Sequence, residues 1–110
     1  QSLDRAERLI RQALAQNPTP RHFYLDTLGV ILIKKGAIGE ASDVLLAGLS
    51  LAPPGETSGR AALLYHLGLV RLAQGNPRAA APLFREAVSL DPAGPFGAES
   101  RKALEPLADK

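Results

Sequence analysis

The chain has 110 residues, 45% of them hydrophobic and 22% charged, which is the size and composition of one ordinary globular domain. Thirteen basic and eleven acidic residues give a net charge of +2, a field too weak to indicate a nucleic-acid or membrane-surface partner. The absence of cysteine excludes disulfides, thiolate zinc sites and a cysteine nucleophile, and no apolar run approaches the length that spans a bilayer.

Six helices are expected from the spacing of apolar residues, taken in chain order. The first covers 2–16, two pairs follow at 21–35 with 38–51 and at 59–74 with 77–90, and the last covers 95–109. Residues 29–33 could also form a buried strand on propensity alone. The equivalent stretch of the second pair has no β-branched run but the same spacing, so we interpret both as helical.

The two helix pairs repeat one pattern of apolar and small residues, which is the signature of a repeat architecture. The pattern consists of Leu28, Gly29, Gly36, Ala41, Gly48 and Pro53 in one unit, and of Leu67, Gly68, Gly75, Ala80, Ala87 and Pro92 in the next. Gly29 with Ala41, and Gly68 with Ala80, are expected to let paired helices approach closely. The second unit is longer because of inserted residues, which we assign to a loop at 56–60.

The joint spacing resembles that of the tetratricopeptide repeat. This resemblance implies an all-α fold, a right-handed superhelical stack of antiparallel helix pairs within a single domain of 1–110. Residues 1–19 would be the second helix of an incomplete repeat, 21–55 and 61–94 full repeats, and 95–110 a capping helix. Five positions depart from the family pattern. Leu25 and Leu64 stand where the early bulky residue is usually aromatic, Leu32 and Arg71 occupy a later aromatic position, and Gly48 replaces the usual alanine.

The two ends of the stack differ in pattern. The last helix has Phe96, Leu104 and Leu107 on its expected inner side and charged residues outside, which suits a terminal helix. The first helix would turn Leu3, Ile10 and Leu14 toward a neighbour. Since the chain begins at Gln1 and has no methionine, we expect that neighbour to be further repeats of a larger protein, or a second copy in a homodimer. The stretch 25–29 resembles repeats of large bacterial proteins, which implies a bacterial-type parent.

No catalytic residue, metal site or cofactor is indicated, so the chain is not expected to be an enzyme. His22 and His66 have no metal-ligand spacing, and neither a nucleophile elbow nor a phosphate-binding glycine loop occurs. Asp26 and His66 are expected to come near one another, more as a hydrogen-bonded pair in a groove than as an acid–base pair.

The resemblance implies that first helices line a concave wall that holds a peptide or helix of a partner protein. Helical geometry assigns to this wall Phe23, Asp26, Thr27, Val30, Ile33 and Lys34 from one unit and Ala62, Tyr65, His66, Leu69, Leu72 and Ala73 from the next. Coverage of part of the wall by the terminal helix is the alternative. Asp26, Val30, Tyr65 and Leu69 stand where carboxylate-binding relatives carry cationic or amide side chains, so a chaperone-tail ligand is not expected.

The sequence thus favours a non-catalytic interaction module. One alternative is a regulatory or scaffold segment of a larger enzyme or of an exopolysaccharide or export assembly, and another is a homo-oligomerisation module. Cytoplasm and periplasm are both compatible with the composition.

Overall fold

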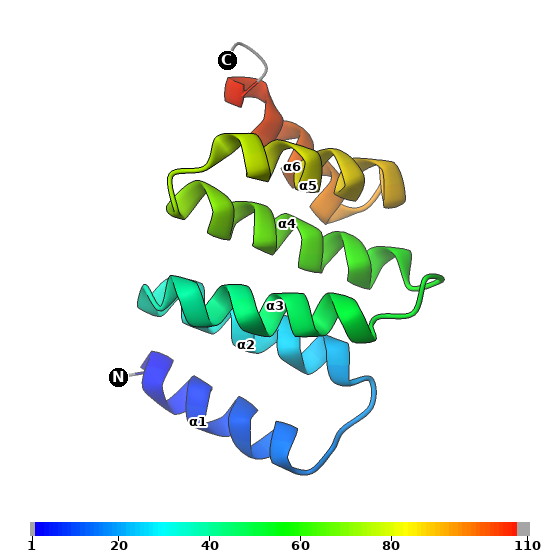
Figure 1. Cartoon of the computed structure of the whole chain (residues 1–110). Helices are drawn as coiled ribbons and strands as arrows, with labels where there is room; N and C mark the ends of the chain where they lie inside the picture. Colours follow the sequence, from blue (N-terminus) through cyan, green and yellow to red (C-terminus); the bar gives the residue numbers. More distant parts are fainter. Residues whose placement is uncertain (1, 108–110) are drawn as a thin grey trace.

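The computed structural model describes residues 2–107, and every regular element in this range is helical (Figure 1). The elements are α1 (Ser2–Ala15), α2 (Arg21–Lys35), α3 (Ile38–Leu51), α4 (Thr57–Ala73), α5 (Pro77–Leu90), α6 (Pro95–Leu104) and the 3-10 turn η1 (Glu105–Leu107). The expected all-α class with six helices is therefore confirmed. Residues 29–33, for which a strand was the alternative, lie inside α2.

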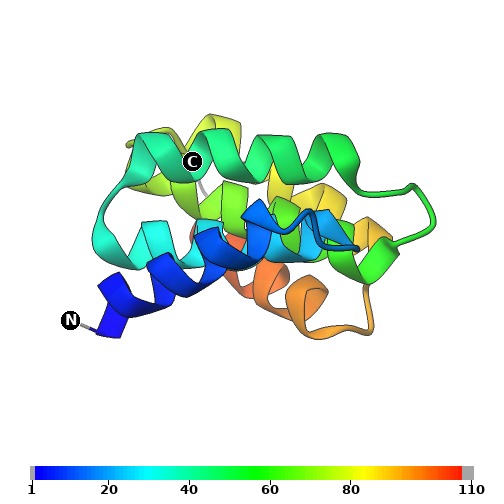
Figure 2. The same cartoon turned by 90° about the horizontal axis from the view of Figure 1, so that it is seen from below.

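Successive helices stack on one another from one end of the molecule to the other. Figure 1 shows α1 at one end, the α2–α3 and α4–α5 pairs in the middle and α6 at the opposite end. In the view of Figure 2, α3 and α5 lie on one side of the stack and α6 on the other. The helix pairs form the stack that the repeat pattern predicts.

A glycine on the first helix of each pair permits close packing of the second helix. A Cβ atom on Gly29 would overlap the Leu45 side chain of α3, and one on Gly68 would overlap the Phe84 ring of α5. Leu45 and Phe84 are both fully buried, as are the alanines one turn earlier on the same helices. The close approach expected at both glycines is thus present, with a large side chain filling the space that each glycine leaves.

Glycine also ends the first helix of each pair. Gly36 and Gly75 have φ angles of 82° and 75°, in the left-handed region that other residues rarely adopt. At the end of α2, the amides of Gly36 and Ala37 donate to the carbonyls of Ile33 and Leu32 at 3.0 and 2.9 Å. These bonds satisfy carbonyls that the helix end leaves without partners, so the turn into α3 is set by local sequence.

The main hydrophobic core lies between α2, α3 and α4. Its buried members are Leu28, Leu32, Ala41, Leu45, Ala52, Leu63, Leu67 and Val70. A second cluster of Ala61, Leu64 and Ala87 joins α4 to α5, with Phe96 of α6 packed against it. Helices α2 and α4 are therefore fixed rigidly next to one another, and the surface they share is preorganised.

The inserted segment differs from the loop expected at 56–60, because α4 already begins at Thr57. The connection from α3 consists of residues 52–56 instead. Arg60 supplies the physical reason: its guanidinium donates to the carbonyls of Ala52 at 2.9 Å and Leu49 at 3.3 Å, at the end of α3. The insertion therefore lengthens α4 at its amino end and fastens it to the preceding helix.

The expectation that α1 turns an apolar face away from the chain is wrong. Ile10 and Leu14 are partly buried against the main core, and Leu3 is half-buried. The exposed side of α1 carries Arg5 and Arg8, with Leu9 as its large apolar residue. The apolar side of α1 packs against the rest of the chain and is not available to a second copy. The structure therefore does not support the homodimer expected through Leu3, Ile10 and Leu14.

A chain of ion pairs fixes α1 to the same two helices. Lys35 of α2 lies 2.6 Å from a carboxylate oxygen of Glu7 and also pairs with Asp4. Glu7 in turn accepts from Arg11 at 2.8 Å, and Arg11 pairs with Glu40 of α3. These contacts lie at the surface, where they orient the helix more than they stabilise it.

The last helix ends earlier than expected, at Leu104, and continues as η1 up to Leu107. Pro106 has no amide hydrogen to continue the α-helical pattern, which explains the change. The predicted positions 108 and 109 lie outside the described residues. The outer positions Glu99, Arg101, Lys102 and Glu105 are exposed, as a terminal helix requires.

Candidate functional site

A cleft of about 320 Å³ opens where the amino-terminal halves of α2 and α4 meet α6. We call it the α2–α4 cleft. It is lined by Pro20, His22, Phe23, Asp26, Glu56, Ser58, Gly59, Ala62 and Phe96. Since α2 and α4 are joined through the main core, the two long walls of the cleft belong to one rigid unit.

Phe23 is the most exposed large hydrophobic side chain of the described residues, with 63% of its surface accessible. It occupies the first turn of α2, and its ring meets Tyr24 edge to face at 5.9 Å between centroids. An aromatic ring of this exposure beside an apolar hollow is typical of binding surfaces rather than of a solvated helix face.

Close packing behind the cleft fixes the amino ends of α2 and α4. His22 is only 6% exposed, and a Cβ atom on Gly59 would lie 3.2 Å from its Nε2 atom. On the far side, a Cβ atom on Gly48 of α3 would lie 2.8 Å from Leu63 Cδ2. The small residues at 48 and 59 therefore allow three helices to meet here, and His22 is a packed structural residue.

Asp26 and His66 connect the two walls in the middle of their helices. The His66 Nδ1 atom lies 2.8 Å from Asp26 Oδ1, and the two side chains are 12% and 18% exposed. The contact expected between these residues is present. It joins the first helices of two successive pairs, so it fixes the width of the cleft that Asp26 helps to line.

The acidic character of the α2–α4 cleft is its main electrostatic feature. Two carboxylates, those of Asp26 and Glu56, are among its lining groups, and neither lysine nor arginine is among them. Apolar atoms of Phe23, Ala62 and Phe96 supply the rest of the surface. The arrangement suits a ligand with an apolar group next to a positive charge.

Helix α6 covers part of the wall expected from the sequence. The Tyr65 ring is 5.8 Å from Phe96 and 5.9 Å from Phe84, and Phe96 also meets His66 edge to face at 5.2 Å. Burial in this cluster raises the pKa of Tyr65 above its usual 10.0, and the nearby Glu99 adds to the effect. Tyr65 and His66 thus face a neighbouring helix, which was the alternative left open by the sequence.

The other expected wall residues lie toward the carboxyl ends of α2 and α4. Ile33 packs against the main core, Val30, Leu69 and Leu72 are half-buried, and Lys34 is exposed. None of these five residues is among those that line the α2–α4 cleft. Of the twelve wall residues expected from the sequence, Phe23, Asp26 and Ala62 line it directly.

Sequence reasoning missed most of the second wall. Glu56, Ser58 and Gly59 were assigned to a loop, although α4 begins at Thr57 and brings them to the cleft. Phe96 was expected only as an inward residue of the last helix. The sequence did contain one signal for a longer α4. Arg60, a basic residue, directly precedes the apolar residues of that helix and lies eight residues after Ala52.

Two further properties concern the described part of the chain as a whole. No group of three or more histidine, aspartate or glutamate side chains in residues 2–107 could hold a metal ion. None of the described helices combines the length and the apolar character that crossing a membrane requires.

The comparison with protein families supports the repeat pattern. The model of the tetratricopeptide repeat matches residues 61–93, which run from the second turn of α4 through α5 to the turn before α6. Comparisons with curated proteins and with solved structures give no match.

Proposed function

We propose that this chain, a tetratricopeptide repeat protein with its matched repeat at residues 61–93, is a non-catalytic module that binds a peptide of a partner protein in the α2–α4 cleft. Tetratricopeptide repeats in general mediate protein–protein interaction. The exposure of Phe23 beside this preformed hollow is the observation that carries the proposal.

The chemistry of the cleft defines the peptide. Phe23, Ala62 and Phe96 offer apolar surface, which favours an aromatic or aliphatic anchor residue. Asp26 and Glu56 favour a lysine or arginine close to that anchor, and they disfavour a ligand that presents a carboxylate. The partner segment is therefore an apolar residue next to a basic one.

The proposal is tested by selecting peptides from a random displayed library on the immobilised chain. We expect one class of the selected peptides to share an aromatic or aliphatic residue beside a lysine or arginine. They should lose about tenfold or more in affinity for Phe23→Ala, which removes the exposed ring. Leu9→Ala is the matched control, because Leu9 is 56% exposed on α1, away from the cleft.

Two results would contradict the proposal. One is that none of the selected peptides binds Phe23→Ala more weakly than it binds Leu9→Ala. The other is an acidic consensus among the peptides whose binding depends on Phe23, which would mean that the carboxylates of Asp26 and Glu56 do not face the ligand.

A further inference from the structure

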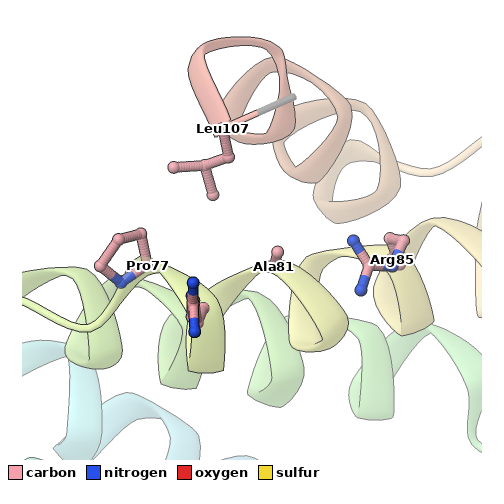
Figure 3. Close-up of a pocket in the computed structure, with 5 residues that line it drawn as sticks. Pro77, Ala81, Arg85 and Leu107 are labelled. Atoms are coloured by element: carbon pink, nitrogen blue, oxygen red, sulfur yellow. The ribbon is translucent and has the colours of Figure 1, made fainter. Parts of the chain in front are cut away.

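A second cleft lies at the far end of the stack, between α5 and η1. Two adjoining hollows of about 280 and 240 Å³ share Ala81, Arg85 and Leu107, and are completed by Pro77, Arg78 and Leu104. We call them together the α5–η1 cleft. Figure 3 shows Leu107 above α5 with its side chain directed toward Pro77 and Ala81, so the hollow is bounded by an apolar roof and floor.

At the preceding junction of the stack, a side-chain hydrogen bond joins the two helices at the corresponding position. There, Arg71 of α4 donates to the Ser42 hydroxyl of α3 at 3.0 Å and to Gln74 at 2.9 Å. In the repeat pattern Ala81 corresponds to Ser42, since Ala80 corresponds to Ala41. At the α5–η1 cleft the facing residues are leucines, which make no such bond, and the space remains open.

Two arginines flank this opening without a partner among the described residues. Arg78 and Arg85 are exposed, and neither forms an ion pair or a side-chain hydrogen bond within residues 2–107. The acidic residue nearest in sequence, Glu86, is exposed and makes no ion pair with them either. A guanidinium pair beside apolar surface is suited to carboxylates, which arginine binds in a bidentate manner.

The spacing of these residues indicates the form of the ligand. Arg78, Ala81 and Arg85 are separated by three and four positions, so they form one stripe on α5 that rises about 10 Å from end to end. A second helix lying along this stripe repeats the same spacing, with acidic residues seven positions apart and aliphatic residues between them. Ala81 lies midway between the two arginines, and its small side chain leaves the hollow below Leu107 open to a side chain of that helix.

We infer that the α5–η1 cleft is a docking site for an acidic amphipathic helix of a partner protein. Two carboxylates of this helix pair with Arg78 and Arg85, and an aliphatic side chain between them enters the space bounded by Ala81, Leu104 and Leu107. The site is separate from the α2–α4 cleft and opposite to it in charge, so the chain binds two chemically different segments at two places.

The probe for this site is a blocked helical peptide of about 18 residues, long enough to form a helix when bound. It carries two glutamates seven positions apart, two leucines midway between them and a neutral background. A peptide with lysine in place of both glutamates is its control. Binding to the isotope-labelled full chain is followed by amide chemical shifts at up to about 1 mM peptide, which detects weak complexes.

We expect the glutamate peptide to shift amides of Ala81, Arg85, Leu104 and Leu107. Measured at these four amides, it should bind at least about tenfold more tightly than the lysine peptide. The double variant Arg78→Glu with Arg85→Glu should reverse this preference. The double variant Arg5→Glu with Arg8→Glu makes the same charge change on the exposed side of α1 and should keep the wild-type preference. In Ala81→Phe, which fills the floor without changing charge, both peptides should bind more weakly.

The inference is overturned if the glutamate peptide does not shift these amides, if both peptides bind there equally, or if the glutamate peptide shifts amides of the α2–α4 cleft instead. It is also overturned if the double variant at Arg78 and Arg85 and the double variant at Arg5 and Arg8 change peptide binding equally. Binding would then depend on the net charge of the chain and not on the α5–η1 cleft. A glutamate peptide bound in the α2–α4 cleft would also contradict the basic ligand proposed for that cleft, whereas the other outcomes leave that proposal, which rests on Phe23, unaffected.

Discussion

The Phe84 ring occupies the space that a side chain on Gly68 would need. The ring is fully buried between α4 and α5, and Gly68 is buried opposite it. The pair explains why the repeat has glycine at this position: the volume missing on the first helix is supplied by the second.

Gly68→Ala is therefore expected to destabilise the chain. The added Cβ atom overlaps an aromatic ring that has no free space to move into, and overpacking of this kind costs about 1–3 kcal/mol. The free energy of unfolding in urea is the measurement. Gly39→Ala is the control, since a Cβ atom there meets nothing within 4 Å, and it should leave stability unchanged or slightly raised. Equal losses in both variants would contradict the packing derived for α4 and α5.

Ser100→Ala is expected to stabilise the chain. The Ser100 hydroxyl is fully buried in α6 and has no hydrogen-bond partner among the described residues. Removing such a group avoids its desolvation penalty, a gain of about 1 kcal/mol in thermal or urea unfolding. Ser42→Ala is the opposite case, because it deletes the acceptor of Arg71 and should cost about 1 kcal/mol. Destabilisation by Ser100→Ala would show that this hydroxyl is satisfied.

The attachment of α1 is expected to weaken in acid. Hydrogen bonding to Lys35, together with its charge, lowers the pKa of Asp4 and Glu7 below their usual 3.8 and 4.5, and Arg11 adds to the effect at Glu7. Because the folded chain holds these carboxylates ionised, their contribution is complete above the usual values and is lost as the pH falls through the lowered ones.

Lys35→Met removes the main cause of both shifts. We expect the free energy of unfolding of this variant to decline less between about pH 5 and pH 2 than that of wild type, by a small amount because the pairs are at the surface. Lys34→Met is the matched control, as Lys34 is exposed and forms no ion pair with a described residue. The prediction fails if the two variants have the same acid dependence.

The bond between Asp26 and His66 should appear as an energetic coupling between two helix pairs. In a double-mutant cycle with Asp26→Ala and His66→Ala, we expect an interaction free energy of about 0.5 kcal/mol or more, because both side chains are largely shielded from water. Glu99 and Lys102 form a comparison pair at 3.5 Å with both side chains exposed, and their coupling should be near zero. Additive effects at Asp26 and His66 would mean that the bond does not fix the cleft width.

Features that depend on a few neighbouring residues were predictable from the sequence. The helix-ending glycines Gly36 and Gly75 adopt the left-handed conformation that few other residues tolerate, and the spacing of Gly29 and Gly68 predicted close helix contacts. Such constraints are local or repeat along the chain, so the pattern of one unit helps to assign the structure of the other. This is why residues 29–33 could be assigned to a helix although their β-branched side chains also favour a strand.

The remaining features depend on contacts between distant segments. The position of α1 follows from where Ile10 and Leu14 find apolar partners, and an amphipathic stripe alone does not say on which neighbour it lies. The start of α4 follows from the bonds of Arg60 to α3, and the partial cover of the wall follows from Phe96 meeting Tyr65. Phe23 and Asp26 were found because the cleft uses the exposed side of α2, which helical geometry does predict.

The aromatic contacts around the α2–α4 cleft give the chain its own optical reporters. It has two tyrosines and no tryptophan, so its near-ultraviolet emission comes from Tyr24 and Tyr65 alone. Tyr24 touches Phe23 on one wall, and Tyr65 touches His66 and Phe96 at the other. A ligand entering the cleft would therefore change the intensity of both fluorophores, and its arrival could be timed in stopped flow without any label.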